Sequence, residues 1–288
     1  MRDAQLAAIR FGFRALSSIA PGLAAHAGER LWFTPPRPRI RDEQRAFLGT
    51  GQRFELAVNG RPVAAWRWGA GPTVVLMHGW GGFGAQMQHF VPPLVDAGFQ
   101  AVAFDAPAHG ESGPSRLGAR RSTLLDFADV LIAMRQEAPE IAGVVAHSGG
   151  GTAAAWALRA SPDLRLRRLA LISPMGSVHR YQDAFQRMVG LSDAAMRRFY
   201  ENTERMLGFR WTDWEVPAMA NGIATPPVLV VHDRDDRETA HEDGASIAAA
   251  WPNAVLRTTT GLGHYRILRD PGVVSEVVQF VRAGREQG

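Results

Sequence analysis

The sequence contains no cysteine and no lysine, and each absence excludes a class of protein. Without cysteine there can be no disulfide framework, no thiol nucleophile and no thiolate zinc site, which suits a reducing compartment. We therefore expect a cytoplasmic protein. All 32 basic residues are Arg, the formal net charge is only +4, and the arginine pairs are dispersed along the chain. These features argue against a nucleic-acid partner.

Signatures for metals, phosphates and membrane spans are missing as well. The nine histidines do not form an H-E-x-x-H helix, and the chain has no P-loop, so no metal or cofactor is expected. No apolar run is long enough to cross a bilayer, so we expect no stable membrane insertion. With 288 residues and 46% hydrophobic composition, the chain can form one large α/β domain with an insertion.

The N-terminal region has the pattern of an amphipathic helix. Apolar residues recur at helical spacing on one side: Leu6, Ile9, Phe13, Leu16 and Ala20. We expect this helix to pack on the main domain; a membrane-surface helix is the alternative. A signal peptide is disfavoured because Arg10 and Arg14 interrupt the apolar stretch. A proline-rich stretch, 34–38, follows, so residues 1–50 are predicted to be a helical segment and linker.

Next comes an alternation of strands and helices. Strand-like runs at 53–58 and 62–68 flank Asn59-Gly60, a dipeptide favoured in tight hairpins. Later apolar runs at 73–77, 101–104, 144–146, 169–172, 228–231 and 255–258 alternate with helical patterns at 86–97, 123–136, 150–160, 240–250 and 271–282. This alternation predicts an α/β core over residues 51–176 and 226–288, with a mostly parallel sheet flanked by helices.

Residues 177–225 interrupt that alternation. They contain no strand pattern, and helical patterns cover 181–189, 192–207 and 212–219. We interpret this segment as an inserted helical lid. Its Phe185, Trp211 and Trp214 are candidates for substrate binding, and packing of the inserted helices on one another is the alternative.

The glycine-rich loop after the first buried strand fits two functions. Residues 79–84 read G-W-G-G-F-G, and Asp105 follows the next strand, which is the pattern of a dinucleotide-binding oxidoreductase. The same loop could instead form part of an oxyanion hole, with His78-Gly79 after a strand and a following backbone N–H turned toward a nucleophile.

The stretch from Val144 to Thr152, V-V-A-H-S-G-G-G-T, indicates a nucleophile elbow with Ser148 at a sharp turn between strand and helix. Small residues are needed there because a strained turn leaves no room for bulky side chains; Ala146 stands where Gly is commonest. An acidic turn, H-D-R-D-D, follows a later strand, and G-L-G-H ending in His264 follows the next one. A dinucleotide-binding fold would not require an elbow serine, an acidic turn and a histidine in this order. The order therefore favours the oxyanion-hole interpretation of the glycine-rich loop at 79–84.

Four motifs together resemble those of the α/β-hydrolase superfamily over residues 53–282: H-G-W-G-G, D-A-P-A-H-G-E-S, A-H-S-G-G and G-L-G-H. The resemblance implies Ser148 as nucleophile, Asp236 as orienting acid and His264 as base. It also implies an oxyanion hole from the N–H groups of Trp80 and Gly149. The D-A-P-A-H-G-E-S loop is structural in relatives, so its histidine, residue 109, is not expected to be catalytic.

The expected acid is Asp236, although Asp233 and Asp235 lie in the same turn. Asp233 follows the strand too closely, whereas Asp236 lies within the loop and matches the last Asp of the relatives' H-G-x-x-D pattern. Trp80 and His147 are expected to contact substrate, in addition to the lid aromatics.

The resemblance further implies a serine hydrolase that cleaves carboxylic esters or thioesters through an acyl-enzyme, with no cofactor. The expected partner is a small-molecule ester, and the protein is expected to be a monomer or homodimer. An acyltransferase or a lyase using the same triad is the alternative. Dehalogenases and epoxide hydrolases of similar fold use Asp where Ser148 stands, so those reactions are disfavoured.

Overall fold

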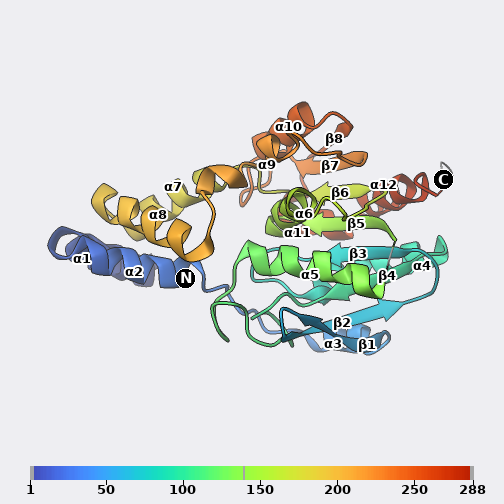
Figure 1. Ribbon diagram of the computed structural model, residues 1–288, viewed down its shortest axis with the longest axis horizontal. Helices are drawn as coiled ribbons and strands as arrows, with labels where there is room; N and C mark the ends of the chain where they lie inside the picture. Colours follow the sequence, from blue (N-terminus) through green and yellow to red (C-terminus); the bar gives the residue numbers. More distant parts are fainter. Residues whose placement is uncertain (1–2, 139, 286–288) are drawn as a thin grey trace. The chain divides into compact units, whose positions relative to one another are not determined.

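A computed structural model of the chain describes residues 3–138 and 140–285 (Figure 1). The chain forms two compact units. One, the sheet unit, comprises Pro35–Gly176 and Val216–Gly288. The other, the helical unit, comprises Met1–Thr34 and Ser177–Glu215.

The sheet unit contains an eight-stranded sheet in the order β1-β2-β4-β3-β5-β6-β7-β8. Its strands are β1 (Gln52–Val58), β2 (Arg61–Trp68), β3 (Thr73–Met77), β4 (Gln100–Phe104), β5 (Ile141–His147), β6 (Leu169–Ile172), β7 (Val228–Asp233) and β8 (Ala254–Thr259). The predicted hairpin is confirmed: β1 and β2 pair antiparallel, and Asn59 and Gly60 between them have φ of 51° and 73°. Two consecutive positive φ values are what a type I′ hairpin turn requires.

All strand pairs from β4 onward along the sheet are parallel, whereas β2 pairs antiparallel with β4. The predicted mostly parallel sheet flanked by helices is therefore confirmed. The carboxyl ends of its parallel strands lie at one edge, where folds of this class hold their functional residues.

Helices cover both faces of this sheet. On one face, η1 (Gly84–Phe90), α4 (Val91–Asp96) and α12 (Pro271–Arg282) share a core cluster with strand residues that include Ala170 and Ile172. On the other face lies α6 (Gly149–Ala160), where a Cβ on Gly151 would meet the Leu171 side chain at 3.2 Å. Helix α5 (Leu124–Glu137) packs on α6. Helix α10 (His241–Ala250) packs on β7 and β8.

The helix predicted over residues 86–97 is divided. A 3₁₀ helix, η1, comes first, and α4 begins at Val91, with Pro92 and Pro93 in its first turn. Prolines lack the N–H that an unbroken helix would need there, but they fit the first turn of a new one. The division therefore follows from a proline pair that hydrophobic periodicity ignores.

The helical unit is built from two segments that are far apart in the sequence. It contains α1 (Asp3–Ile19), α2 (Pro21–Trp32), α7 (Val178–Val189), α8 (Asp193–Leu207) and η2 (Trp211–Trp214). Helix α1 contacts α2 and α7, and α2 contacts α8. The N-terminal helix, expected on the main domain, is thus part of a unit with the inserted segment. Trp32, the last residue of α2, also packs its ring edge-on against Phe185 and Phe199 of the insertion.

Two further differences concern boundaries. Residues 216–225, placed in the insertion by the sequence pattern, belong to the sheet unit, and α9 (Val216–Met219) contacts α6 and α10 there. The expected linker contains a short helix, α3 (Asp42–Leu48). Within the described part of the chain, no helix is both long and apolar enough to cross a membrane.

Candidate active site

Ser148 lies at the junction between β5 and α6. Its backbone adopts φ 53° and ψ −127°, a conformation that L-residues rarely adopt. The turn is held by hydrogen bonds from Ser148 N to Ile172 O (3.0 Å) and from Gly151 N to Ser148 O (2.9 Å). Strain of this kind persists only where the surrounding structure fixes it, and it is characteristic of functional positions.

The small residues around Ser148 are required by close packing. A Cβ on Gly150 would lie 2.5 Å from the carbonyl oxygen of His78, closer than real Cβ atoms approach backbone. A Cβ on Gly79 would lie 3.0 Å from the Cβ of Ser148. The loop after β3 therefore lies directly against the elbow.

The two predicted oxyanion donors are close to each other. Gly149 is the first residue of α6, so its N–H is among those left free at a helix N-terminus. Trp80 N lies 3.9 Å from the position that a Cβ on Gly149 would take. The helix dipole adds a favourable field for negative charge at this end.

The glycine loop is fastened to the loop that follows β4. Asp105 Oδ1 accepts from Gly84 N (2.6 Å), and His109 Nε2 accepts from Gly81 N (3.1 Å). Burial raises the pKa of Asp105 to about 6 and lowers the pKa of His109 to about 4, so His109 is neutral and can accept. His109 therefore connects the glycine-rich loop to the loop that follows β4.

Asp236 and His264 form a close pair. His264 Nδ1 lies 2.8 Å from Asp236 Oδ2, and the Asp236 side chain is buried. Its Oδ1 accepts from the N–H groups of Glu238 and Thr239, both at 2.9 Å. Burial by itself would raise the pKa of Asp236, but the neighbouring His232 and His264 rings and the Thr239 N–H outweigh it and hold this pKa well below its ordinary value.

The two other carboxylates of the acidic turn hold loops instead. Asp233 Oδ2 accepts from Thr259 Oγ1 (2.7 Å) and Leu262 N (3.0 Å), and Asp235 Oδ2 accepts from Gly261 N (2.7 Å). Hydrogen bonds keep the pKa of Asp233 below its usual value although burial opposes this. Both residues therefore fix the turn that carries His264 without contacting its ring.

His147 is buried and contacts His264, and its predicted contact with substrate stays a prediction. The two rings lie 4.5 Å apart between centroids, and His147 Nε2 donates to the His264 carbonyl at 3.0 Å. Burial, together with the nearby His264, lowers the pKa of His147 to about 3, so this ring is neutral. Because His147 directly precedes Ser148, it links the elbow to the loop that carries His264.

The Nε2 atom of the buried His264 ring faces Glu238. Glu238 Oε2 lies 3.9 Å from His264 Nε2 and accepts from Tyr265 OH at 2.8 Å. Among the described residues no hydrogen bond joins the Ser148 hydroxyl to His264. Such bonds are often long in the absence of substrate and shorten when substrate binds.

Sequence reasoning missed two residues next to Asp236. Thr239 Oγ1 lies 3.0 Å from Asp236 Oδ2, and the buried His232 Nε2 lies 3.6 Å from the same oxygen. His232 Nε2 also donates to Thr239 O at 3.1 Å. The position of His232, directly ahead of an acidic turn at the end of a buried strand, was the signal that could have identified it.

The three aromatic residues predicted to bind substrate lie in the helical unit, where they are buried. Phe185 and Trp211 surround Trp32, with ring centroids 5.2 and 6.4 Å from it, and Trp214 contacts Phe209 at 5.1 Å. The packing alternative accounts for these contacts, and a substrate-binding role for the three stays a prediction. Among the residues that the structure describes, no group of three or more His, Asp or Glu side chains could hold a metal ion.

Comparison with known proteins shows the family to which the chain belongs. The family model described as serine aminopeptidase, S33, matches residues 70–245, and a model described as TAP-like protein matches residues 210–288. A non-heme chloroperoxidase, CPO-A1, from Kitasatospora aureofaciens is 35% identical over 68% of this chain and 86% of its own length.

Two other comparisons differ in coverage. The acetyltransferase component of the acetoin cleaving system from Cupriavidus necator is 38% identical over 38% of this chain, so the chain spans only 28% of that relative. The structure of the Pyrococcus furiosus esterase Pf2001 superposes with a TM-score of 0.62, at 20% identity, over 87% of this chain and 98% of the esterase. Because the family model covers more than half of the sequence, the chain belongs to the α/β-hydrolase superfamily.

Proposed function

We propose that this hydrolase cleaves carboxylic esters or thioesters through an acyl-enzyme formed on Ser148. The observation that carries the proposal is the Asp236–His264 pair, 2.8 Å apart, in a loop that is joined to the elbow through His147. A buried carboxylate bonded to Nδ1 of an imidazole leaves Nε2 free to take a proton.

In the first half-reaction, His264 Nε2 takes the Ser148 hydroxyl proton while Oγ attacks the carbonyl carbon. The resulting oxyanion accepts from the N–H groups of Trp80 and Gly149. His264 then gives its proton to the departing alkoxide or thiolate as the carbonyl–leaving-group bond breaks, which leaves the acyl group on Ser148.

In the second half-reaction, water attacks the acyl-enzyme and His264 takes the water proton. The same two N–H groups stabilise the second oxyanion, and the proton returns to Ser148 Oγ as the carboxylic acid leaves. Asp236 holds the imidazole in the required tautomer and stabilises its charged form in both halves. His147 acts as a positioning residue, because it fixes the backbone of His264 without touching the reacting atoms.

The proposal is tested by turnover of p-nitrophenyl esters from acetate to palmitate, with Ser148→Ala as the control. We expect turnover by the wild type, and a loss on the order of 10⁴-fold or more in Ser148→Ala. Because the matching family model is described as serine aminopeptidase, aminoacyl p-nitroanilides are assayed in parallel. Cleavage of anilides without ester turnover would replace the esterase proposal with an aminopeptidase one.

Acyl transfer is distinguished in the same assay by adding an alcohol acceptor. If the ester of the added alcohol forms in place of free acid at low acceptor concentration, the protein is an acyltransferase. If free acid predominates, it is a hydrolase.

A further inference from the structure

A second carboxylate lies beside the reacting nitrogen of His264. Glu238 Oε2 is 3.9 Å from His264 Nε2, whereas Asp236 contacts the other ring nitrogen, Nδ1, at 2.8 Å. The Asp236 side chain is fully buried, but the Glu238 side chain is 52% exposed. Asp236 therefore has its partner inside the protein, whereas Glu238 is open to a molecule that arrives from solvent.

The position of Glu238 is fixed by two hydrogen bonds. Its N–H donates to Asp236 Oδ1 at 2.9 Å, and its Oε2 accepts from Tyr265 OH at 2.8 Å. Partial burial and the hydrogen bond to Glu238 raise the pKa of Tyr265, so its hydroxyl stays protonated and remains the donor. The Glu238 carboxylate is thus held beside the imidazole.

No basic side chain neutralises Glu238. Among the residues that the structure describes, no arginine forms an ion pair with it. The guanidinium of Arg266, close by in the sequence, donates to the carbonyls of Leu262 and Gly261. The turn over residues 233–238 contains four carboxylates and two arginines, a formal charge of −2. An exposed carboxylate in such surroundings attracts cations.

The proposed mechanism brings the leaving group to this carboxylate. His264 Nε2 takes the Ser148 proton and then donates it to the departing oxygen or sulfur, so that atom must come within hydrogen-bond distance of Nε2. Glu238 Oε2 lies 3.9 Å from the same nitrogen. Substituents on the leaving alcohol or thiol can therefore reach Glu238, while the acyl group stays bonded to Ser148.

Tyr265 adds an aromatic ring at the same place. Its side chain is 53% exposed, and its ring lies 5.0 Å from the His264 ring, nearly perpendicular to it. An aromatic ring attracts a cation through its negative face, and a carboxylate attracts it through its charge. The pair of Glu238 and Tyr265 therefore suits an ammonium group better than a neutral or anionic one.

We propose that Glu238 selects esters and thioesters whose leaving group carries an ammonium ion, and that Tyr265 positions Glu238. The ammonium lies against the Glu238 carboxylate and the Tyr265 ring while His264 protonates the departing atom. The inference rests on the proposed ester cleavage, because that reaction defines the leaving group. It names a substrate class that the Ser148, His264 and Asp236 set alone leaves open.

The test compares acetylcholine with 3,3-dimethylbutyl acetate, the neutral ester in which carbon replaces the nitrogen. The two leaving alcohols have the same shape and differ in charge. We expect wild type to have the higher kcat/KM for the choline ester. Glu238→Gln should lower the ratio of choline to neutral ester by about three- to fivefold, with the neutral ester nearly unchanged. Salt should reduce the preference of wild type, because the carboxylate is half exposed.

Tyr265→Phe tests the positioning role. This variant keeps the ring and removes the hydroxyl that holds Glu238. It should lower the same ratio by about twofold and leave the neutral ester unchanged. A merely structural role would instead lower turnover of both esters together and leave the ratio as it is in wild type.

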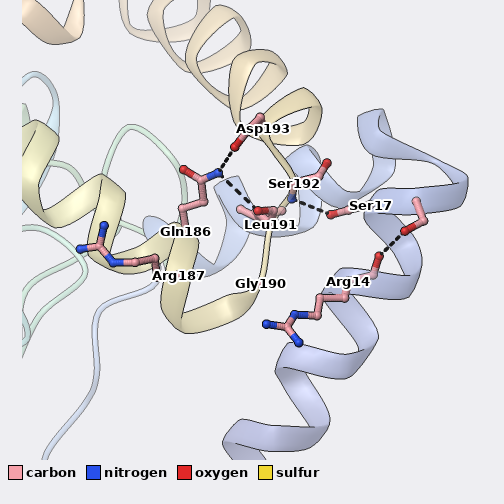
Figure 2. Close-up of a pocket in the computed structure, with 9 residues that line it drawn as sticks. Arg14, Ser17, Gln186, Arg187, Gly190, Leu191, Ser192 and Asp193 are labelled. Atoms are coloured by element: carbon pink, nitrogen blue, oxygen red, sulfur yellow. Dashed lines mark hydrogen bonds between the residues drawn. The ribbon is translucent and has the colours of Figure 1, made fainter.

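Two matched controls each remove one negative charge elsewhere. Glu55 is exposed on the edge strand β1, and Glu55→Gln should keep the wild-type ratio. Asp193 lies in the helical unit, where its Oδ1 accepts from Gln186 Nε2 at 2.9 Å (Figure 2). An amide oxygen can keep that bond, so Asp193→Asn should also keep the ratio.

Three outcomes would overturn the proposal. The first is an equal ratio in wild type and Glu238→Gln. The second is an equal loss of both esters in Glu238→Gln, which would make Glu238 a support for His264. The third is a fall of the ratio in the controls as large as in Glu238→Gln, which would assign the effect to overall charge.

A wild type that cleaves neither ester would contradict the proposed ester cleavage, and the inference is then decided by binding. Saturation-transfer NMR compares choline with its neutral carbon analogue. We expect wild type to bind choline more strongly, and Glu238→Gln to lose the difference. Equal binding of the two alcohols by wild type would overturn the inference.

Discussion

Replacing Asp236 by Asn is the sharpest perturbation of the acid–base pair. Oδ1 of Asp236 accepts two backbone N–H groups, so the Asn carbonyl oxygen must keep that position. The amide nitrogen then takes the place of Oδ2 and presents an N–H toward His264 Nδ1, 2.8 Å away. Two donors cannot face each other, so the imidazole moves its proton to Nε2 and can no longer accept from Ser148.

The expected cost is about 10⁴-fold in kcat, or about 5.5 kcal/mol of transition-state stabilisation, with KM nearly unchanged. The assay is steady-state turnover of a p-nitrophenyl ester, alongside thermal unfolding to show that the variant folds. Asp235→Asn is the matched control, because an amide oxygen can keep the hydrogen bond that the Asp235 side chain accepts from Gly261 N. Near-normal turnover of Asp236→Asn, with loss in Asp235→Asn or Asp233→Asn, would refute the assignment.

Three further variants test the surroundings of the site. His147→Phe removes the donor to the His264 carbonyl and should lower kcat about tenfold with little change in KM, measured by ester turnover. Gly150→Ala places a Cβ 2.5 Å from a backbone carbonyl, so it should lower the free energy of unfolding by about 1–3 kcal/mol in denaturant titrations. Gly12→Ala is the control, because there is open space around Gly12; it should leave the free energy of unfolding unchanged or raise it by up to about 1 kcal/mol. The pKa of His109 is lowered to about 4 in the folded protein, so the unfolded chain takes up this proton at higher pH than the folded one. The free energy of unfolding of the wild type should therefore fall by roughly 3 kcal/mol as the pH falls from 6.5 to 4. His109→Gln should lack this part of the acid dependence.

Much of the sheet unit could be predicted from the sequence because its signals are local. Buried parallel strands give short apolar runs, and the Asn59-Gly60 dipeptide directly encodes a turn with two positive φ values. The positions that follow these strands converge at one edge of a parallel sheet. The order of Ser148, Asp236 and His264 along the chain therefore predicts a common site at that edge. The structure brings Asp236 within 2.8 Å of His264 there.

The helical unit was harder because its contacts join distant segments. Nothing local indicates that Trp32 packs against Phe185, or that Gly28 lies beside Leu191. The orientation of the His147 ring was also not readable, since the sequence places the residue next to Ser148 without saying which way its ring points. In the structure the ring points to His264 and is closed off from solvent.

The measurement that tests the central claim most directly is covalent labelling by a fluorophosphonate, read by intact mass and peptide mapping. Such a probe reacts only with a serine whose proton is removed by a neighbouring base. We predict one adduct per chain, on Ser148, that is absent in Ser148→Ala and much slower in Asp236→Asn. Equal labelling of wild type and Ser148→Ala, or no labelling of either, would contradict the account.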